Sequence, residues 1–294
     1  MLRLIYYKYL YFLLSALVIV PGIFSLVRWG LRPGIDFTGG TLLELRITPP
    51  ENRQVTAADL KKLLEDERSE VSSVQSSGGK TFLVRLKPID QERNKQLQQK
   101  MQEKLGVVEE LRLETVGPTL GKELLKKTLI ALSVAAGLIL IFVGYQFKDK
   151  SFGLCAVLAM FHDSLVVLGI FSLLGHFLGV EVDTLFVTAV LTILSFSVHD
   201  TIVVYDRIRE SRKYFPKANF EDLVDKAVAE TLGRSVNNSM TVIFMLLALY
   251  LLGGETTKWF VFALLIGTIS GTYSSTFTAA PLLVVWEKLK NRKK

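Results

Sequence analysis

The chain has 294 residues, of which 50% are hydrophobic, with a mean hydropathy of +0.36 and a formal net charge of +7. This composition, with its apolar residues gathered in long blocks, excludes an ordinary soluble domain and indicates an integral membrane protein. The basic excess lies beside the apolar blocks, so membrane topology explains it without a nucleic-acid partner, and the single cysteine, Cys155, excludes internal disulfides and a cysteine-based metal site.

Six apolar runs are long enough to cross a bilayer as helices. They cover residues 9–29, 126–147, 152–178, 183–205, 236–253 and 258–286. Sixteen Lys and Arg residues lie in the N-terminal flank, the loops at 148–150 and 206–234 and the C-terminal tail, whereas the two short loops on the opposite side, around 179–183 and 253–258, contain only Lys258. This distribution predicts that both termini are cytoplasmic. We expect the first run to be a retained anchor, because no small-residue cleavage site follows it.

The polar segment between the first two runs predicts a separate extracytoplasmic domain. Residues 30–124 follow a strand-helix-strand-strand-helix-strand pattern, which is the order of the ferredoxin-like α+β fold. The expected strands are 41–48, 71–76, 81–86 and 107–116, and the expected helices are 56–68 and 90–105. The flanking parts are the cytoplasmic N-terminus with the first span (1–29), a bundle of the other five spans (125–286, with a cytoplasmic loop at 206–235) and a basic cytoplasmic tail (287–294).

Two local patterns support this division. Thr56 followed by Asp59 is a capping-box pattern that starts the first helix, and Ser77-Gly78-Gly79-Lys80 is typical of a tight hairpin connection. A glycine-rich motif precedes the first strand, and its glycines permit positive φ and close backbone approach where a span turns into a strand. Since neither a helix start nor Gly-Lys-Ser/Thr follows, a rigid connector is favoured over a phosphate-binding loop. The motif comprises Gly34, Asp36, Phe37, Thr38, Gly39 and Gly40.

Two His-Asp pairs lie within apolar runs, His162-Asp163 in the third and His199-Asp200 in the fourth. A charge at that depth costs about 2.5–3.5 kcal/mol, so such a group is normally paired, hydrated or functional. At 1.5 Å per residue the two aspartates lie at similar depth, and Arg234 at the start of the fifth run is a candidate partner for Asp200. A carboxylate between desolvation and an arginine can change its proton occupancy as helices move. The pattern predicts a proton relay, and hydrogen bonding between helices remains the alternative.

Two further stretches predict helix placement. Asn219 begins a helix with one apolar face, which we expect to lie along the inner membrane surface and to lead Arg234 into the fifth span. In the last run Gly267, Gly271 and Ser275 recur every fourth position, which predicts close packing against another helix. Pro281 lies near the inner end of that run, where a kink is tolerated.

The chain resembles the SecD and SecF protein-export family, and SecF more closely because SecD carries a much larger outer region. The resemblance rests on Gly-Ile-Asp-Phe-Thr-Gly-Gly-Thr (34–41), on the stretch 197–210 in the fourth run, and on Thr-Leu-Gly-Arg-Ser (231–235). It implies half of the architecture of resistance-nodulation-division transporters. It also implies that Asp200 and Arg234 take part in proton transport, with a further aspartate supplied by SecD.

The resemblance implies an accessory subunit of the Sec translocase in the bacterial inner membrane, and no enzymatic reaction. The implied partners are a SecD-like protein, the SecYEG channel with YajC or YidC, preprotein substrates and membrane lipids. We expect no nucleic acid, no metal and no cofactor other than the proton as coupling ion. Two alternatives remain open: an exporter of small molecules or lipids, which usually carries two such halves on one chain, and a passive scaffold, which has no need of a membrane carboxylate.

Overall fold

The computed structural model describes residues 3–50, 54–76, 80–147 and 149–292. The chain divides into two compact units, a membrane unit formed by Met1–Arg32 with Ile130–Lys294 and an inserted unit formed by Pro33–Leu129. Within the described residues, six helical stretches are long and apolar enough to cross a membrane, which confirms the six runs expected from hydropathy.

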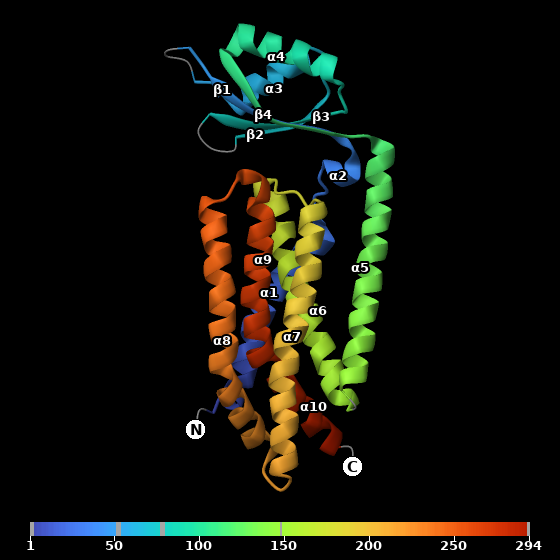
Figure 1. Cartoon of the computed structure of the whole chain (residues 1–294), viewed down its shortest axis with the longest axis vertical. Helices are drawn as coiled ribbons and strands as arrows, with labels where there is room; N and C mark the ends of the chain where they lie inside the picture. The colour runs from blue at the N-terminus through green and yellow to red at the C-terminus, as the bar shows by residue number, and fades with distance from the viewer. Residues whose placement is uncertain (1–2, 51–53, 77–79, 148, 293–294) are drawn as a thin grey trace. The chain divides into compact units, whose positions relative to one another are not determined.

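The membrane helices form a bundle with three buried members (Figure 1). The elements are η1 (Ile5–Tyr7), α1 (Lys8–Arg28), α5 (Pro118–Gln146), α6 (Lys150–Leu178), α7 (Thr184–Tyr214), α8 (Phe220–Leu252), α9 (Glu255–Ser274), a π-helical segment (Ser275–Ala279) and α10 (Ala280–Arg292). Half or more of the apolar stretch of α6, of α7 and of the run through α9 is buried, whereas α1, α5 and α8 are mostly exposed. The exposed helices present leucine, valine and phenylalanine side chains, as lipid contact requires.

The stretch 206–235, expected as a cytoplasmic loop, consists largely of the ends of two long helices. Helix α7 continues to Tyr214, and α8 begins at Phe220, where the side chain of Asn219 accepts the amide hydrogen of Glu221 at 3.0 Å. The amphipathic stretch is therefore the first part of α8 and not a separate helix along the inner surface. No proline interrupts 220–252, and Arg207 of α7 pairs with Glu230 of α8 at 2.5 Å, so the helix passes unbroken into the fifth span.

The last run also contains an irregularity ahead of Pro281. Five residues, Ser275–Ala279, form a π-helix, and Pro281 lies in the first turn of α10. In a regular α-helix the proline ring would meet the carbonyl group four residues earlier, which belongs to Phe277. The wider π turn relieves that clash. The hydroxyl of the buried Tyr205 on α7 donates to the carbonyl oxygen of Ala279 at 2.8 Å. This carbonyl group at the end of the π-helical segment is therefore hydrogen-bonded.

Helices α1 and α6 approach each other through glycine. A Cβ atom built on Gly22 would lie 3.1 Å from the Cα of Gly169. One turn further on, the hydroxyl groups of Ser25 and Ser172 are 2.6 Å apart, and Ser172 also donates to the carbonyl oxygen of Gly30 at 2.7 Å. In a membrane, small residues commonly allow two helix backbones to come into close contact, and polar side chains then form hydrogen bonds between the helices.

The inserted unit is a four-stranded antiparallel sheet with two helices on one face. Its elements are α2 (Ile35–Thr38), β1 (Gly40–Thr48), α3 (Ala57–Asp66), β2 (Val71–Ser76), β3 (Thr81–Leu86), α4 (Gln91–Leu105) and β4 (Val107–Val116). The strand order is β2-β3-β1-β4, with all three pairings antiparallel. Every expected strand and helix of this segment is confirmed within one or two residues, as is the Thr56–Asp59 capping box. The expected hairpin turn falls on residues 77–79, outside the described residues.

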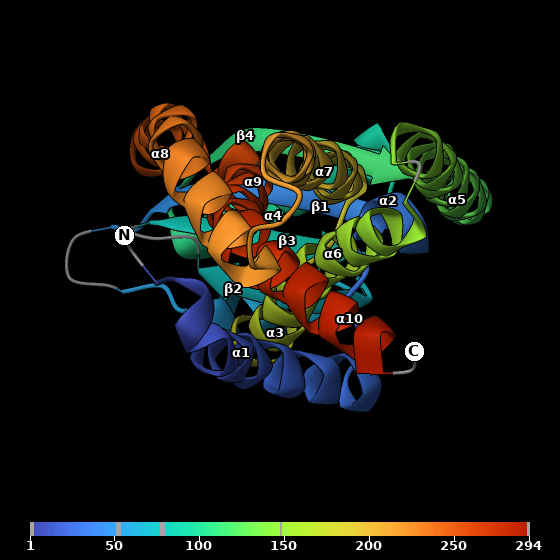
Figure 2. The same ribbon diagram turned by 90° about the horizontal axis from the view of Figure 1, so that it is seen from below.

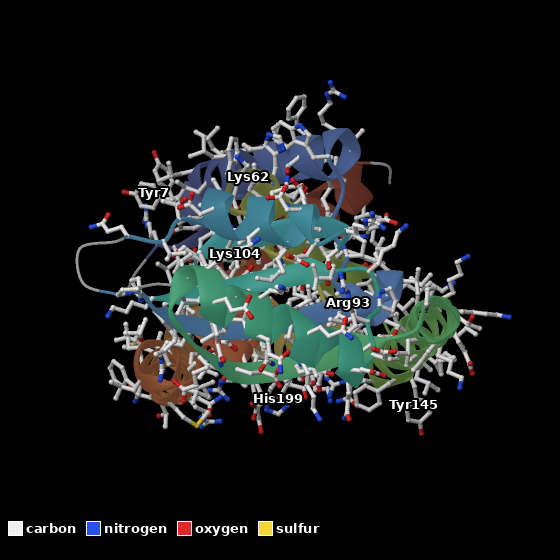
Figure 3. All side chains as sticks on the ribbon, turned by 90° about the horizontal axis from the view of Figure 1, so that it is seen from above. Tyr7, Lys62, Arg93, Lys104, Tyr145 and His199 are labelled. Carbon is white, nitrogen blue, oxygen red and sulfur yellow. The ribbon has the colours of Figure 1, made fainter. Side chains whose placement is uncertain are left out.

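The core of this unit follows from alternation along the strands. In β1, Leu43, Leu45 and Ile47 are buried while Arg46 is exposed, as expected for a strand with one covered face. The covered face packs against the leucines of α3 and α4, which lie side by side (Figures 1 and 3). Arg93 and Lys104, labelled on α4 in Figure 3, both reach Glu67 at the end of α3, through its carbonyl oxygen and its carboxylate respectively.

The glycine-rich motif packs backbone to backbone against the beginning of α5. Gly39 has φ 75° and ψ 160°, a region that only glycine adopts readily, and a Cβ atom on it would lie 2.7 Å from the Cα of Pro118. A Cβ on Gly121 would in turn lie 3.0 Å from the carbonyl oxygen of Phe37. The hydroxyl of Thr38 donates to the carbonyl oxygen of Gly34 at 3.0 Å, so the motif forms a tight connector whose glycines are required by space and by φ.

Substitution of Gly39 by alanine tests this connector. We expect Gly39→Ala to destabilise the protein by about 1–3 kcal/mol from backbone strain, with a further cost from the clash with Pro118. Gly117→Ala is the matched control, since a Cβ there meets nothing within 4 Å and its φ is not positive. The measurement is thermal unfolding of the purified full chain in detergent, together with its rate of limited proteolysis. Equal stability of the two variants would contradict the assignment.

Candidate functional site

The buried centre of the membrane unit is the contact between α7 and α9. A Cβ atom on Gly267 would lie 2.2 Å from a side-chain carbon of Ile193, and one on Gly271 would lie 3.3 Å from the ring of Phe196. Ser275, the third of the expected small residues, is fully buried. The glycines allow the backbone of α9 to approach α7 closely, so that short polar side chains on the two helices can reach each other.

Asp163 on α6 lies at this contact and is completely buried. Three serine hydroxyl groups donate to its carboxylate at 2.6 Å each: Ser197 and Ser274 to Oδ2, and Ser270 to Oδ1. The Nδ1 atom of the adjacent His162 lies 3.0 Å from Oδ1. An ionised carboxylate offers about four acceptor positions and no donor, so these four groups fill its capacity.

His162 extends the contact to a fourth helix. Its Nε2 atom lies 3.0 Å from the hydroxyl oxygen of Ser15 on α1, and that hydroxyl lies 3.4 Å from the hydroxyl of Thr278. A neutral ring protonated at Nδ1 and an imidazolium ring both satisfy these contacts. Hydrogen bonds therefore join α1, α6, α7 and α9 at one point. We call this group the Asp163 node, and it comprises Ser15, His162, Asp163, Ser197, Ser270 and Ser274.

Asp200 has different surroundings from Asp163. It is 4% exposed and faces α8, where the hydroxyl of Ser235 donates to its Oδ2 at 3.0 Å. Among the described residues, this is the one hydrogen bond that the side chain of Asp200 makes. One turn further along α8, the hydroxyl of Ser239 receives a hydrogen bond from Thr272 of α9 at 2.6 Å. The structure thus separates a carboxylate saturated with donors from a second carboxylate that retains acceptor capacity.

The other expected relay residues lie at the surface of the membrane unit. Arg234 is exposed on α8, one residue before Ser235, and among the described residues no hydrogen bond or ion pair joins it to Asp200. His199 is exposed and lines a groove of about 470 Å³ between α5 and α7. Figure 3 shows His199 at the periphery, and it remains close enough to act electrostatically on Asp200.

The sequence pattern predicts no role for the serines that bond the two aspartates, which are Ser197, Ser235, Ser270 and Ser274. Ser275, predicted as a small packing residue, donates to the carbonyl oxygen of Thr272 in its own helix. A signal was present, because hydroxyl residues occupy alternate positions 268, 270, 272 and 274 of an otherwise apolar helix. Repeated hydroxyl groups on a membrane helix need acceptors, and a buried carboxylate on a neighbouring helix is a suitable one.

An ionic cluster lies at the end of the bundle where α1 begins and α10 ends. The carboxylate of Glu221 forms ion pairs with Lys8 and Lys288, with Nζ–Oε1 distances of 2.8 Å and 2.7 Å. The carboxylate of Asp225 accepts the amide hydrogen of Ile5 at 2.8 Å. Figure 2, the view from below, shows the first turns of α8 next to the start of α10. The cluster connects η1, α8 and α10 where the helices leave the apolar region.

The described residues contain no group of three or more His, Cys, Asp or Glu side chains placed to hold a metal ion. The arrangement comprises two carboxyl groups buried within a helix bundle, Asp163 with four hydrogen-bonding partners and Asp200 with one. Six apolar helices, an α/β unit between the first two and ionisable groups at membrane depth define a polytopic membrane protein with a polar core.

The chain belongs to the SecD/SecF family of protein export membrane proteins. Residues 96–289 match the family profile described as protein export membrane protein SecD/SecF, C-terminal, and residues 24–51 match the SecD/SecF GG motif. The protein translocase subunit SecF of Thermobaculum terrenum is 44% identical over 98% of this chain and 94% of its own length. The corresponding subunit of Anaerolinea thermophila is 40% identical, with the same coverage.

Two solved structures share the fold. The crystal structure of SecDF, a translocon-associated membrane protein from Thermus thermophilus, matches 97% of this chain with a TM-score of 0.86 and 33% identity. A crystal structure of SecDF in a super-membrane-facing form matches 98% with a TM-score of 0.67 and 34% identity. The chain spans 38% of the length of each SecDF chain, so it is similar to one part of that larger protein.

The difference between the two aspartates predicts different stability effects. Asp163→Ala removes the carboxylate that four groups bond. A hydrogen bond between helices in a membrane protein contributes about 0.6 kcal/mol to stability on average and at most about 1.7 kcal/mol. We expect Asp163→Ala to cost about 2–5 kcal/mol, because orphaned buried donors add to the loss. Asp200→Ala, with one donor, should cost about 1 kcal/mol. Thermal unfolding of the purified variants is the measurement, and a larger effect at Asp200 would contradict the node.

Proposed function

We propose that this chain is an accessory subunit of the Sec translocase that uses proton movement across the bacterial inner membrane to promote preprotein export. The observation that carries the proposal is Asp200, a carboxyl group buried at membrane depth whose side chain has one hydrogen bond within the described part of the chain. Membership of a protein export family supports the export role, and the names of its SecF relatives refer to protein translocation.

The proposal assigns the proton-binding step to Asp200. Its carboxyl group accepts one hydrogen bond from Ser235, which leaves oxygen lone pairs free to take a proton. Asp163 is not required to exchange a proton, because four donors already occupy its oxygens. His199 and Arg234 are the flanking charged or titratable groups of the relay. No cofactor other than the proton enters the proposal. One elementary charge crossing 100 mV supplies about 2.3 kcal/mol, so a few protons can bias a two-state arrangement by several kcal/mol.

We further propose that the inserted unit is a ferredoxin-like domain on the outer side of the membrane and that both termini are cytoplasmic. Two helices on one face of an antiparallel sheet in the order β2-β3-β1-β4 support the first assignment. The excess of Lys and Arg at the ends of α1, α7 and α10 supports the second.

A SecD-like protein is the proposed partner. SecF relatives occur fused to SecD, as in the SecDF subunit of Thermus thermophilus, which is 38% identical over 90% of this chain. Arg234, Asn237 and Asn238 are exposed on α8 near the start of its apolar stretch. Arginine in lipid costs about 2.5–3.5 kcal/mol, which favours a polar protein surface over lipid at this position. SecYEG, YajC or YidC and the preprotein are the further partners that the translocase role implies.

Substitution of Asp200 tests the coupling. Asp200→Asn keeps the volume and removes titration, so we expect normal insertion with loss of the part of export that depends on the proton gradient. Asp200→Glu should retain part of the stimulation, Arg234→Ala should resemble Asp200→Asn, and Arg234→Lys should be milder because a cation remains. The measurement is late-stage preprotein translocation into inverted vesicles with and without a gradient. A passive scaffold predicts equal gradient dependence in the Asp200→Asn and unmodified proteins, and that result would refute the proposal.

Substitutions on α8 test the partner surface. We expect Asn237→Leu combined with Asn238→Leu to reduce copurification of the SecD-like protein from native membranes by about tenfold, which corresponds to about 1.4 kcal/mol. Thr188→Val combined with Thr192→Val on α7 is the matched control, because these exposed hydroxyls bond carbonyl groups of their own helix. Unchanged copurification of the α8 variant would place the partner elsewhere.

A further inference from the structure

One turn of α7 carries both a member of the Asp163 node and the proposed proton-binding residue. Ser197 and Asp200 are three residues apart, so they lie about 4.5 Å apart along the axis on neighbouring positions of the helix. The hydroxyl of Ser197 donates to Asp163 on α6, while the carboxyl of Asp200 accepts from Ser235 on α8. This turn is therefore held by hydrogen bonds to helices on two sides.

The node restrains both the depth and the rotation of this turn. The hydrogen bond from Ser197 is 2.6 Å long, and its acceptor, Oδ2 of Asp163, is shared with Ser274 of α9. A Cβ atom on Gly271 of α9 would lie 3.6 Å from the Cα of Ser197, so the backbones of the two helices are in close contact there. Sliding or rotating α7 would break the hydrogen bond from Ser197 to Asp163, or would bring the backbone of α7 into collision with that of α9 at Gly271.

The groups that surround Asp200 come from four helices, α6, α7, α8 and α9. On its own helix the titratable neighbour is His199, and on α6 it is Asp163, and both are near enough to act on it electrostatically. Helix α8 contributes the hydroxyl of Ser235 and, one residue earlier, the exposed cation Arg234. Helix α9 contributes hydroxyl groups to the surrounding network and no charged side chain. A movement of α7 relative to α6 and α8 would therefore change the distances from Asp200 to Asp163 and to Ser235.

We infer that Asp163 and Ser197 are positioning residues for Asp200, and that the node holds α7 so that the carboxyl group of Asp200 is presented to α8. This inference rests on the proposed function, since it specifies how the proton-binding group of that function is oriented. It gives the first His-Asp pair a role without proton transfer. His162 connects the node to α1 through Ser15, so α1 is part of the frame that sets the position of α7.

The test measures the titration of Asp200 directly. Dicyclohexylcarbodiimide reacts with protonated carboxyl groups in apolar surroundings, and peptide mass mapping distinguishes modification of Asp200 from that of Asp163. The full chain, in native membranes with its partners, is labelled over a range of pH. We expect Ser197→Ala to move the midpoint of Asp200 labelling by about one pH unit, which corresponds to 1.36 kcal/mol. Ser197→Thr, which keeps the hydroxyl, should restore the original midpoint.

Ser270→Ala is the matched control. It removes an equally short hydroxyl bond to the same carboxylate, but from α9 and not from α7, so it should move the midpoint by less than about a third as much. If Ser197→Ala does not accumulate in the membrane, Ser197→Cys, which keeps the volume with a weak donor, replaces it. Equal midpoint shifts in the two variants, or no shift in either, would overturn the positioning role.

The failures of the inference and of the proposed function are distinguishable. Labelling that does not vary with pH in the unmodified protein would overturn both, because Asp200 would not titrate. Gradient-dependent export retained by Asp200→Asn, together with a selective midpoint shift in Ser197→Ala, would overturn the proposed function and support the positioning of Asp200 by Ser197. Loss of gradient dependence in Asp200→Asn without a selective shift would overturn the positioning role alone.

Discussion

A carboxylate inside a membrane bundle must obtain its hydrogen bonds from neighbouring helices, because the bilayer core supplies no water. Asp163 meets this requirement with three serine hydroxyls and a histidine that come from its own and two neighbouring helices. The requirement in turn demands close approach, which the glycines of α9 permit at Gly267 and Gly271. The hydrogen bonds of one buried carboxyl group thus connect α6, α7 and α9.

The same means of association recurs at other helix pairs of the membrane unit. In lipid, apolar side chains gain little by contacting each other, so packing of small residues and hydrogen bonds between helices decide which pairs form. Gly22 and Gly169 bring α1 onto α6, with Ser25 and Ser172 bonded alongside. The hydroxyls of Ser239 and Thr272 join α8 to α9. Helix α5 is the contrast, since its apolar stretch is only 6% buried.

Much of this architecture could be predicted from local sequence patterns. Alternating burial in the strand that contains Leu43 and Leu45, and the cap formed by Thr56 and Asp59, depend on neighbours in the chain, so the sequence reveals them. Hydropathy likewise identifies the six spans, because bilayer thickness sets their length. The unbroken α8 was missed because its composition changes from amphipathic to apolar near Arg234, although no residue there breaks the helix.

The environment of the aspartates could be predicted only in part. The free-energy cost of a charged side chain in lipid identifies Asp163 and Asp200 as candidate functional residues from the sequence. Their hydrogen-bonding partners, however, depend on the rotation of each helix about its axis. Ser235 bonds Asp200 while the adjacent Arg234 is exposed, and one residue along a helix corresponds to a turn of about 100°. No local pattern in the sequence distinguishes these two faces.

The π-helical segment Ser275–Ala279 has a consequence for how this helix tolerates changes in length. A π turn accommodates one residue more than an α turn, so the segment is equivalent to a single-residue insertion in a regular helix. Winding these residues as a regular α-helix at the same chain length would rotate α10 by about 100° relative to α9. Tyr205 would then lose the carbonyl of Ala279, and Lys288 would turn away from Glu221. The π turn therefore absorbs one residue of chain length without changing which side of α10 faces the bundle.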